Sequence, residues 1–135
     1  MPIQIEIISP EKVLVSCQVD MAVLPGIDGD LAAMPEHAPV MLLLRGGVVT
    51  LYKDDTIIDT YFVGGGFADI TQNRCIVLAD RATPVQNIDI DRATAELEAL
   101  SQLWEKADKS DVTRLNILQN EILSVQAEID AGSSS

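Results

Sequence analysis

The spacing of apolar residues changes once along the chain, near residue 88, and this change is the feature that most limits the possible folds. Before it, apolar residues alternate with polar ones, as at Ile3, Ile5 and Ile7. A period of two is typical of strands with one buried face. After it, apolar residues recur at steps of three and four, which is the period of an amphipathic helix. The sequence therefore predicts a strand-rich unit followed by a helical unit.

The distribution of proline and glycine supports this division. All six prolines lie in the first 84 residues, whereas neither proline nor glycine occurs between residues 85 and 131. Both residues interrupt helices, so their absence favours two unbroken helices. We expect a β-sandwich domain at residues 1–87, a helical hairpin at residues 88–131 and a disordered tail at residues 132–135.

The first unit is predicted to be an antiparallel β-sandwich or flattened barrel, because its short strands are regularly spaced and contain few aromatic residues. Two-residue turns are expected at 54–55 and 72–73. The glycines at 64–66 predict a bulge or a closely approaching backbone. The predicted strands are residues 3–7, 13–15, 19–23, 40–44, 48–52, 57–63, 67–71 and 74–79.

Residues 24–47 are rich in chain-breaking residues and are predicted to be an exposed connection that presents its side chains to a partner. Pro35 and Pro39 bracket three residues that include His37, and the glycine pair at 46–47 is expected to end the apolar run that follows. A backbone restricted in this way is suited to binding, because it loses little conformational freedom when a partner binds.

The second unit is predicted to be an antiparallel hairpin of two helices, each of about 18 residues. Asp89 and Ser110 are the expected N-caps, and residues 106–109 form the expected polar turn. The two helices cover only part of each other's apolar stripes, so the hairpin needs a further surface to pack against. The sequence leaves open whether this surface is the sandwich or another protein. The two apolar stripes are Ala93, Leu97, Leu100, Trp104 and Ala107 in the first helix, and Leu115, Leu118, Ile122, Val125 and Ile129 in the second.

The net charge of −12, from 9 basic and 21 acidic residues, disfavours two classes of partner. Nucleic acids are bound through clustered lysine and arginine, so nucleic-acid binding is not expected. Anionic lipid surfaces are disfavoured for the same reason, so any membrane association is expected through protein contacts. No apolar run approaches the roughly 20 residues of a membrane helix, and the N-terminus does not resemble a secretory signal.

Few residues could support catalysis or hold a metal ion. His37 is the one histidine, and no suitably placed nucleophile completes a triad with it. Cys17 and Cys75 lack the spacing of metal ligands, so they are expected to be reduced packing residues. We therefore expect neither an enzyme nor a metal protein.

One acidic segment partly matches a calcium-binding loop. Asn87, Asp89, Asp91 and Glu98 correspond to positions 1, 3, 5 and 12 of such a loop. Arg92, however, occupies the position at which the loop needs glycine for its sharp turn. The segment is better explained as an acidic first turn of a helix, where negative charge is favourable.

The order of these features resembles the epsilon subunit of F-type bacterial ATP synthases, and the resemblance covers nearly the whole chain. It implies a non-catalytic central-stalk (rotor) subunit with an N-terminal β-sandwich and a C-terminal helical pair. It also implies a peripheral location on the cytoplasmic face of the plasma membrane. The matching features are Gly29, Asp30, Pro35, His37, Ala38 and Pro39, the late strand at 70–80, and the helix start Ile88-Asp89-x-x-Arg92-Ala93.

The resemblance also implies partners. The sandwich would bind the gamma subunit and the ring of c subunits, and so couple ring rotation to the catalytic head. Gamma is expected on an apolar face that the sequence does not identify. The catalytic beta subunit is a possible partner of the hairpin. By position, the residues expected to face the ring are Asp30, Met34, Glu36 and His37.

Two properties of some family members are not expected here. Ile88, Asp89, Arg92 and Ala93 match a short nucleotide-binding signature, so the resemblance places ATP contacts there. Residues 88–135, however, carry 4 basic and 10 acidic residues, and this charge of −6 opposes a polyanionic ligand. We therefore expect no cofactor. Residues 111–130 carry one basic residue, Arg114, against four acidic ones, which opposes contact with an acidic segment of beta. Self-inhibition by the hairpin is therefore expected to be weak or absent, with any brake supplied by a different subunit.

Two other functions remain open from the residues alone. One is a free-standing β-sandwich module that binds a small ligand or carbohydrate beneath a helical lid, although the chain offers few aromatic rings for stacking. The other is a hydrolase that uses His37 with a carboxylate, which the lack of a nucleophile disfavours.

Overall fold

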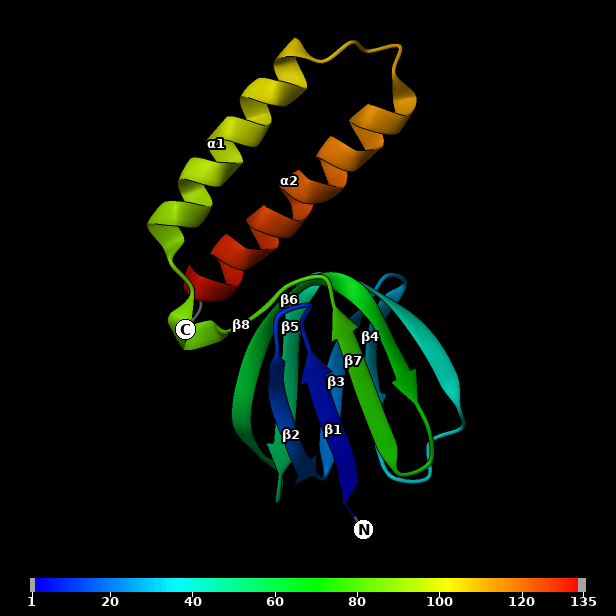
Figure 1. Cartoon of the computed structure of the whole chain (residues 1–135). Coiled ribbons are helices and arrows are strands. Elements are labelled where there is room, and N and C mark those ends of the chain that lie inside the picture. The colour runs from blue at the N-terminus through cyan, green and yellow to red at the C-terminus, as the bar shows by residue number, and fades with distance from the viewer. Residues whose placement is uncertain (1, 134–135) are drawn as a thin grey trace.

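Strands occupy the first part of the chain and two long helices the second in the computed structural model, which describes residues 2–133 (Figure 1). This arrangement confirms the predicted fold class. A short 3₁₀ helix at Val85–Asn87 joins the two parts. The elements are β1 (Ile3–Ile8), β2 (Val13–Val19), β3 (Met21–Gly26), β4 (Gly29–Ala33), β5 (Val40–Lys53), β6 (Thr56–Ile70), β7 (Arg74–Ala79), β8 (Ala82–Pro84), α1 (Ile90–Lys106) and α2 (Val112–Ser133).

The strands follow one another in space in the order β2-β1-β7-β6-β5-β3-β4, with β8 paired to β6. The sheet is mixed rather than purely antiparallel, because β1 and β7 run parallel to each other. Their partners on either side are antiparallel. Parallel strands need a long connection along the chain. Here the connection from β1 to β7 contains the strands β2 to β6.

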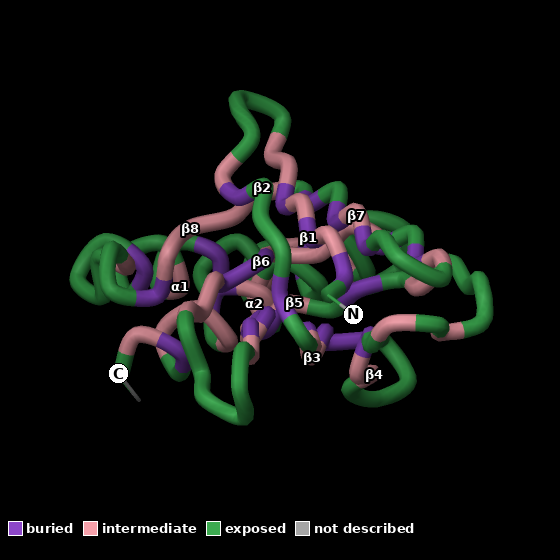
Figure 2. The backbone as a smooth tube through the Cα atoms, turned by 90° about the horizontal axis from the view of Figure 1, so that it is seen from below, coloured by how far each residue is buried: buried purple, intermediate pink, exposed green. Residues whose placement is uncertain are grey.

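Buried and partly exposed residues alternate along β1, as the sequence predicts. Ile3, Ile5 and Ile7 are fully buried, and the residues between them are partly exposed. The alternation at 19–23 is shared by two strands, since β2 ends at Val19 and β3 starts at Met21. Figure 2 shows how buried and exposed segments alternate along the backbone.

The two cysteines differ in their surroundings, and both are free thiols. Cys75 lies in the sandwich core, where burial raises the pKa of its thiol to about 12. Cys17 is exposed on β2. The prediction that both are packing residues was therefore wrong for Cys17: it lies opposite the buried Ile5, but β2 is an edge strand of the sheet and the Cys17 side chain stays exposed.

Both long strands run through glycine positions at which the sequence predicted an interruption. β5 continues through 46–47, and β6 continues through 64–66 without a bulge. Leu44 pairs with Gly66, Gly46 pairs with Gly64, and the irregularity in this pair of strands lies between Leu51 and Tyr52 instead. Pairing along 14 and 15 residues outweighs the weak strand preference of glycine. Both strands curve along their length (Figure 1).

Most of the predicted exposed connection at 24–47 is sheet. It contains the end of β3, all of β4 and the first half of β5, so only residues 34–39 form an open loop. The β3–β4 pair is a tight hairpin in which Gly26 faces Gly29. The chain breakers at the start of this region therefore mark a turn between strands, and those at 35 and 39 mark the loop.

The two helices pack against each other along the predicted stripes. The buried residues of this interface are Ala93, Leu100, Leu118 and Val125. Around them lie Leu97, Trp104, Ala107, Ile122 and Ile129, which are partly buried. The stripes read from the sequence are thus confirmed for every residue except Leu115, which is not part of this cluster.

The start of α1 agrees with the sequence prediction, whereas the start and the end of α2 differ from it. Asp89 caps α1 by accepting a hydrogen bond from the backbone N–H of Arg92 at 3.1 Å. The predicted cap of α2 was one residue early, because Asp111 accepts from the N–H of Arg114 at 3.2 Å. Ser110 instead donates to Asp108, and hydrogen bonds from its backbone N–H and its hydroxyl lower the pKa of that carboxyl.

Helix α2 extends to Ser133, two residues beyond the predicted end of the hairpin. Gly132 lies within its last turn, so this glycine does not end the helix. The rest of the predicted tail, residues 134–135, lies outside the described residues.

Two glycines with positive φ give a matched test of the tight packing between β6 and β7. A Cβ at Gly66 (φ 121°) would lie 2.2 Å from the Leu78 carbonyl oxygen, whereas a Cβ at Gly29 (φ 134°) would have no atom of the described residues within 4 Å apart from those of its two chain neighbours. We expect Gly29→Ala to lower the free energy of unfolding by about 1–2 kcal/mol through conformation alone. Gly66→Ala should cost at least about 1 kcal/mol more because of the clash. Urea unfolding measures both, and equal costs would contradict this account.

Candidate functional site

The loop at residues 34–39 is held firmly at one end of the sandwich. The backbone N–H of Glu36 donates to the Gln72 carbonyl at 2.6 Å, which ties the loop to the turn between β6 and β7. The N–H of His37 donates to the Met34 carbonyl at 3.2 Å, and its Nδ1–H donates to the Ala38 carbonyl at 2.6 Å. Glu36 has a φ of 68°, so its backbone takes a conformation that non-glycine residues seldom adopt.

The structure brings together three of the four residues that the resemblance places at a partner contact. Met34 and Glu36 are exposed, and His37 is half-buried beside them. Asp30 lies near the other end of β4, where it pairs with Pro25 of β3. There it accepts a hydrogen bond from the Arg45 guanidinium at 2.5 Å. Since β4 separates Asp30 from the loop, the four side chains do not form one cluster.

A row of apolar side chains crosses the outer face of the sheet and was not found from the sequence. Residues directly opposite each other on paired strands project from the same face. The register pairs Val13 with Ile8, Ile8 with Leu78, Leu78 with Phe67, and Phe67 with Leu43. The row ends at Ile27, whose backbone N–H donates to the Leu43 carbonyl at 2.9 Å. We call these six residues the apolar row.

The apolar row is open to solvent. The exposed fractions are 57% for Val13, 37% for Leu78, 61% for Leu43 and 58% for Ile27, while Ile8 and Phe67 are partly buried. Met41, which is 66% exposed, extends the surface along β5. Monomeric proteins seldom expose a continuous apolar surface of this kind, so it indicates a protein interface.

Charged side chains border the apolar row on the side toward the loop. Arg74 and Glu6 form an ion pair at 2.8 Å across β7 and β1. Asp69 lies opposite Met41 on the next strand and is exposed. An apolar centre with a charged rim is the usual composition of a protein–protein contact.

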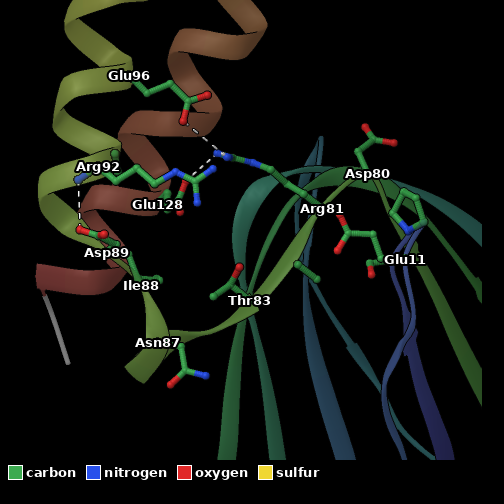
Figure 3. Close-up of a pocket in the computed structure, with 14 residues that line it drawn as sticks. Glu11, Asp80, Arg81, Thr83, Asn87, Ile88, Asp89, Arg92, Glu96 and Glu128 are labelled. Atoms are coloured by element: carbon green, nitrogen blue, oxygen red, sulfur yellow. Dashed lines mark hydrogen bonds and ion pairs between the residues drawn. The ribbon is translucent and has the colours of Figure 1, made fainter.

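The four residues of the predicted nucleotide signature do come together at the base of the hairpin. Ile88, Asp89, Arg92 and Ala93 line a cleft of about 350 Å³ between α1, the β1–β2 turn and the link from β7 to β8 (Figure 3). Ala93 is buried against α2, so its side chain serves the packing of the helices.

The charges around this cleft are mostly negative. Its acidic side chains are Glu11, Asp80, Asp89, Glu96 and Glu128, and its arginines are Arg81 and Arg92. Arg81 is already engaged: its guanidinium lies 2.6 Å from a Glu128 oxygen and 3.9 Å from a Glu96 oxygen (Figure 3). The cleft is therefore poorly suited to a ligand with several negative charges.

Metal binding and membrane crossing find no support in the part of the chain that the structure covers. Within residues 2–133, no three or more His, Cys, Asp and Glu side chains gather closely enough to hold a metal ion. Neither of the two long helices in the same residues is apolar enough over a sufficient length to cross a membrane.

Comparisons with known proteins agree on one family. Residues 2–85 match the family model described as the ATP synthase, Delta/Epsilon chain, beta-sandwich domain. The chain is 53% identical over 131 residues to the ATP synthase epsilon chain of Gluconacetobacter diazotrophicus, a match that covers 97% of this chain and 93% of that one. It is 35% identical over 127 residues to the epsilon chain of Rhodospirillum rubrum, with 91% and 95% covered.

Two solved structures share the fold at low sequence identity. One belongs to the mitochondrial ATP synthase of Euglena gracilis, with a TM-score of 0.73, 16% identity, and 93% of this chain and 80% of that one covered. The other belongs to the central stalk and c-ring of the mitochondrial ATP synthase of Tetrahymena thermophila, with a TM-score of 0.67, 9% identity, and 98% and 97% covered.

Proposed function

This chain belongs to the ATP synthase epsilon chain family, and we propose that it works in the central stalk of a bacterial ATP synthase, where it couples rotation of the c-ring to the catalytic head through gamma. It is a non-catalytic subunit. Family membership replaces the two other functions considered, the carbohydrate-binding module and the hydrolase. The observation that carries the coupling role is the apolar row, because it offers a large interface on one face of the sandwich.

We assign the apolar row to gamma. Five of the six residues lie on five neighbouring strands, β2, β1, β7, β6 and β5. The sixth, Ile27, lies in the β3–β4 turn. A contact that spans this many hydrogen-bonded strands transmits force without a flexible segment. Leu78 and Phe67 lie in the middle of the row, where truncation usually costs most, and Leu43 beside Phe67 is the most exposed residue of the row at 61%.

Substitution within the row tests this assignment. We expect Leu43→Glu to weaken binding of purified gamma by about 30-fold or more, because it places a charge on a highly exposed residue of an apolar interface. Leu123→Glu is the matched control, since Leu123 is similarly exposed but lies on α2. Light scattering after size-exclusion chromatography measures the one-to-one complex. Equal binding by both variants would contradict the assignment.

The loop at 34–39 is the proposed contact with the c-ring. Its two prolines and its hydrogen bond to Gln72 keep Glu36 and His37 in a fixed position, as a contact that transmits torque requires. Asp30 can take part only if the contact extends along β4, which is the last strand of the sheet. Any membrane association then comes through the assembled complex on the cytoplasmic face of the plasma membrane.

The double variant Glu36→Gln and His37→Ala tests the ring contact in the assembled enzyme. We expect ATP-driven proton pumping to fall at least about twofold while ATP hydrolysis is kept, because only the coupling contact is altered. The control is Glu98→Gln, an exposed change on the outer side of α1. If pumping and hydrolysis stay at the control level, the loop is not the contact.

The charge of the hairpin supports the proposal of weak self-inhibition. On α2, Arg114 is the one basic residue, while Glu121, Glu128 and Asp130 are acidic. Contact with an acidic segment of the beta subunit would bring like charges together.

Deletion of residues 89–135 tests this proposal in the purified enzyme. We expect the rate of ATP hydrolysis to change by less than about twofold, which corresponds to less than about 0.4 kcal/mol in the barrier. Gamma binding by the truncated chain, measured in parallel, shows that the sandwich is intact. Strong activation would show that the hairpin is an effective brake.

We propose that the cleft at the base of the hairpin does not bind nucleotide. Arg81 is paired with two carboxylates, and five acidic side chains surround the space that a triphosphate would need. We therefore expect calorimetric titration of ATP into the full chain to show no binding up to about 1 mM. Titration with magnesium present is the necessary companion measurement, and saturable heat in either would contradict the proposal.

A further inference from the structure

We propose that Arg81 is a latch that holds the helical hairpin on the sandwich through ion pairs to both helices. The proposal concerns the chain's own two parts, so it does not depend on the assignments to gamma or to the ring.

Arg81 is fixed at its backbone to the sandwich. It lies in the link between β7 and β8, and its carbonyl accepts a hydrogen bond from the Gly64 N–H at 2.9 Å. The N–H of the preceding Asp80 donates to the Gly65 carbonyl at 3.0 Å. The guanidinium therefore extends toward the hairpin from a firm base.

The side chain of Arg81 reaches both helices. Its guanidinium lies 2.6 Å from Glu128 of α2 and 3.9 Å from Glu96 of α1, as Figure 3 shows. It also lies over the ring of Phe62, with its central carbon 5.7 Å from the ring centre. The Glu128 side chain is only 14% exposed, so loss of Arg81 would leave a carboxylate that is largely shielded from water without this partner.

The rest of the contact between hairpin and sandwich is made by α2. Helix α2, rather than α1, lies against β5 and β6. A Cβ at Gly46 would lie 2.9 Å from the Ser124 Cα, and one at Gly64 would lie 2.7 Å from the Arg81 Cγ. The contact is thus close, and it also includes Val85 and Ala131, which are 7% and 9% exposed. The ion pairs of Arg81 act in addition to this packing.

Phe62 shows that the docked position covers part of the sandwich. It is 1% exposed but does not belong to the core cluster of the sandwich. Since Phe62 pairs with Val48 on β5 and Thr83 on β8, its ring lies on the outer side of these strands, beneath Arg81. Release of the hairpin would therefore uncover an aromatic ring.

Distances between two spin labels test the latch in the full chain. The native Cys17 is exposed and Cys75 is fully buried, so labels attach at Cys17 and at a second cysteine introduced by Gln102→Cys on α1. In the otherwise unchanged chain at low salt we expect one narrow distance distribution. Arg81→Gln should raise the undocked fraction about tenfold or more, which corresponds to the loss of a charge-assisted contact.

Two further variants make the result specific. Arg74→Gln removes an arginine ion pair of similar length within the sandwich and should keep the narrow distribution. The exchange Arg81→Glu with Glu128→Arg should restore most of the docked fraction. An unchanged distribution in Arg81→Gln, or equal broadening in Arg74→Gln, would overturn the latch. Broadening of the unaltered chain near 1 M salt, where charges are screened beyond about 3 Å, would support it.

Discussion

The pairing of β5 with β6 across Gly46 and Gly64 is the contact on which the rest of the structure depends. These two strands are the longest in the sandwich and are joined by pairs from Val40–Ile70 to Lys53–Thr56. Both strands are curved (Figure 1), and Gly46 and Gly64, which pair with each other, have no side chains. The same missing side chains let α2 approach the sheet through Ser124. One feature of the sequence, a glycine on each of the two longest strands, therefore provides the place where the hairpin docks.

Sequence patterns predicted the elements whose stability is decided locally. The alternation at Ile3, Ile5 and Ile7 and the stripes of the two helices correspond to burial in the structure, since each is fixed by the period of a single element. The parallel pairing of β1 with β7 could not be read in this way, because its partners are far apart in sequence. The continuity of β5 through 46–47 was missed for a related reason: the glycines favour an end locally, and the neighbouring strand outweighs that preference.

The same distinction, between features fixed within one element and features that depend on distant parts of the chain, separates the candidate sites. The residues of the nucleotide signature lie together because they occupy the first turn of one helix and the link before it. Asp30 does not lie with Glu36 and His37, since a strand separates positions that are close in sequence. The apolar row can be identified only from the register of several strands. The ion pairs of Arg81 can be identified only from the positions of both helices. Neither leaves a local pattern, so neither could be predicted from the order of residues alone.

The loop at 34–39 and the hairpin occupy different ends of the first half of β5. The loop leads directly into Val40, and α2 rests on Gly46, about 20 Å farther along at the usual rise of a strand. The apolar row crosses β5 at Leu43, between these points. A force that enters at the loop thus reaches the row through a few residues of continuously hydrogen-bonded strand, without passing through the helices. In mechanical terms the hairpin lies outside the load path, so a change in its position leaves the stiffness of that path intact.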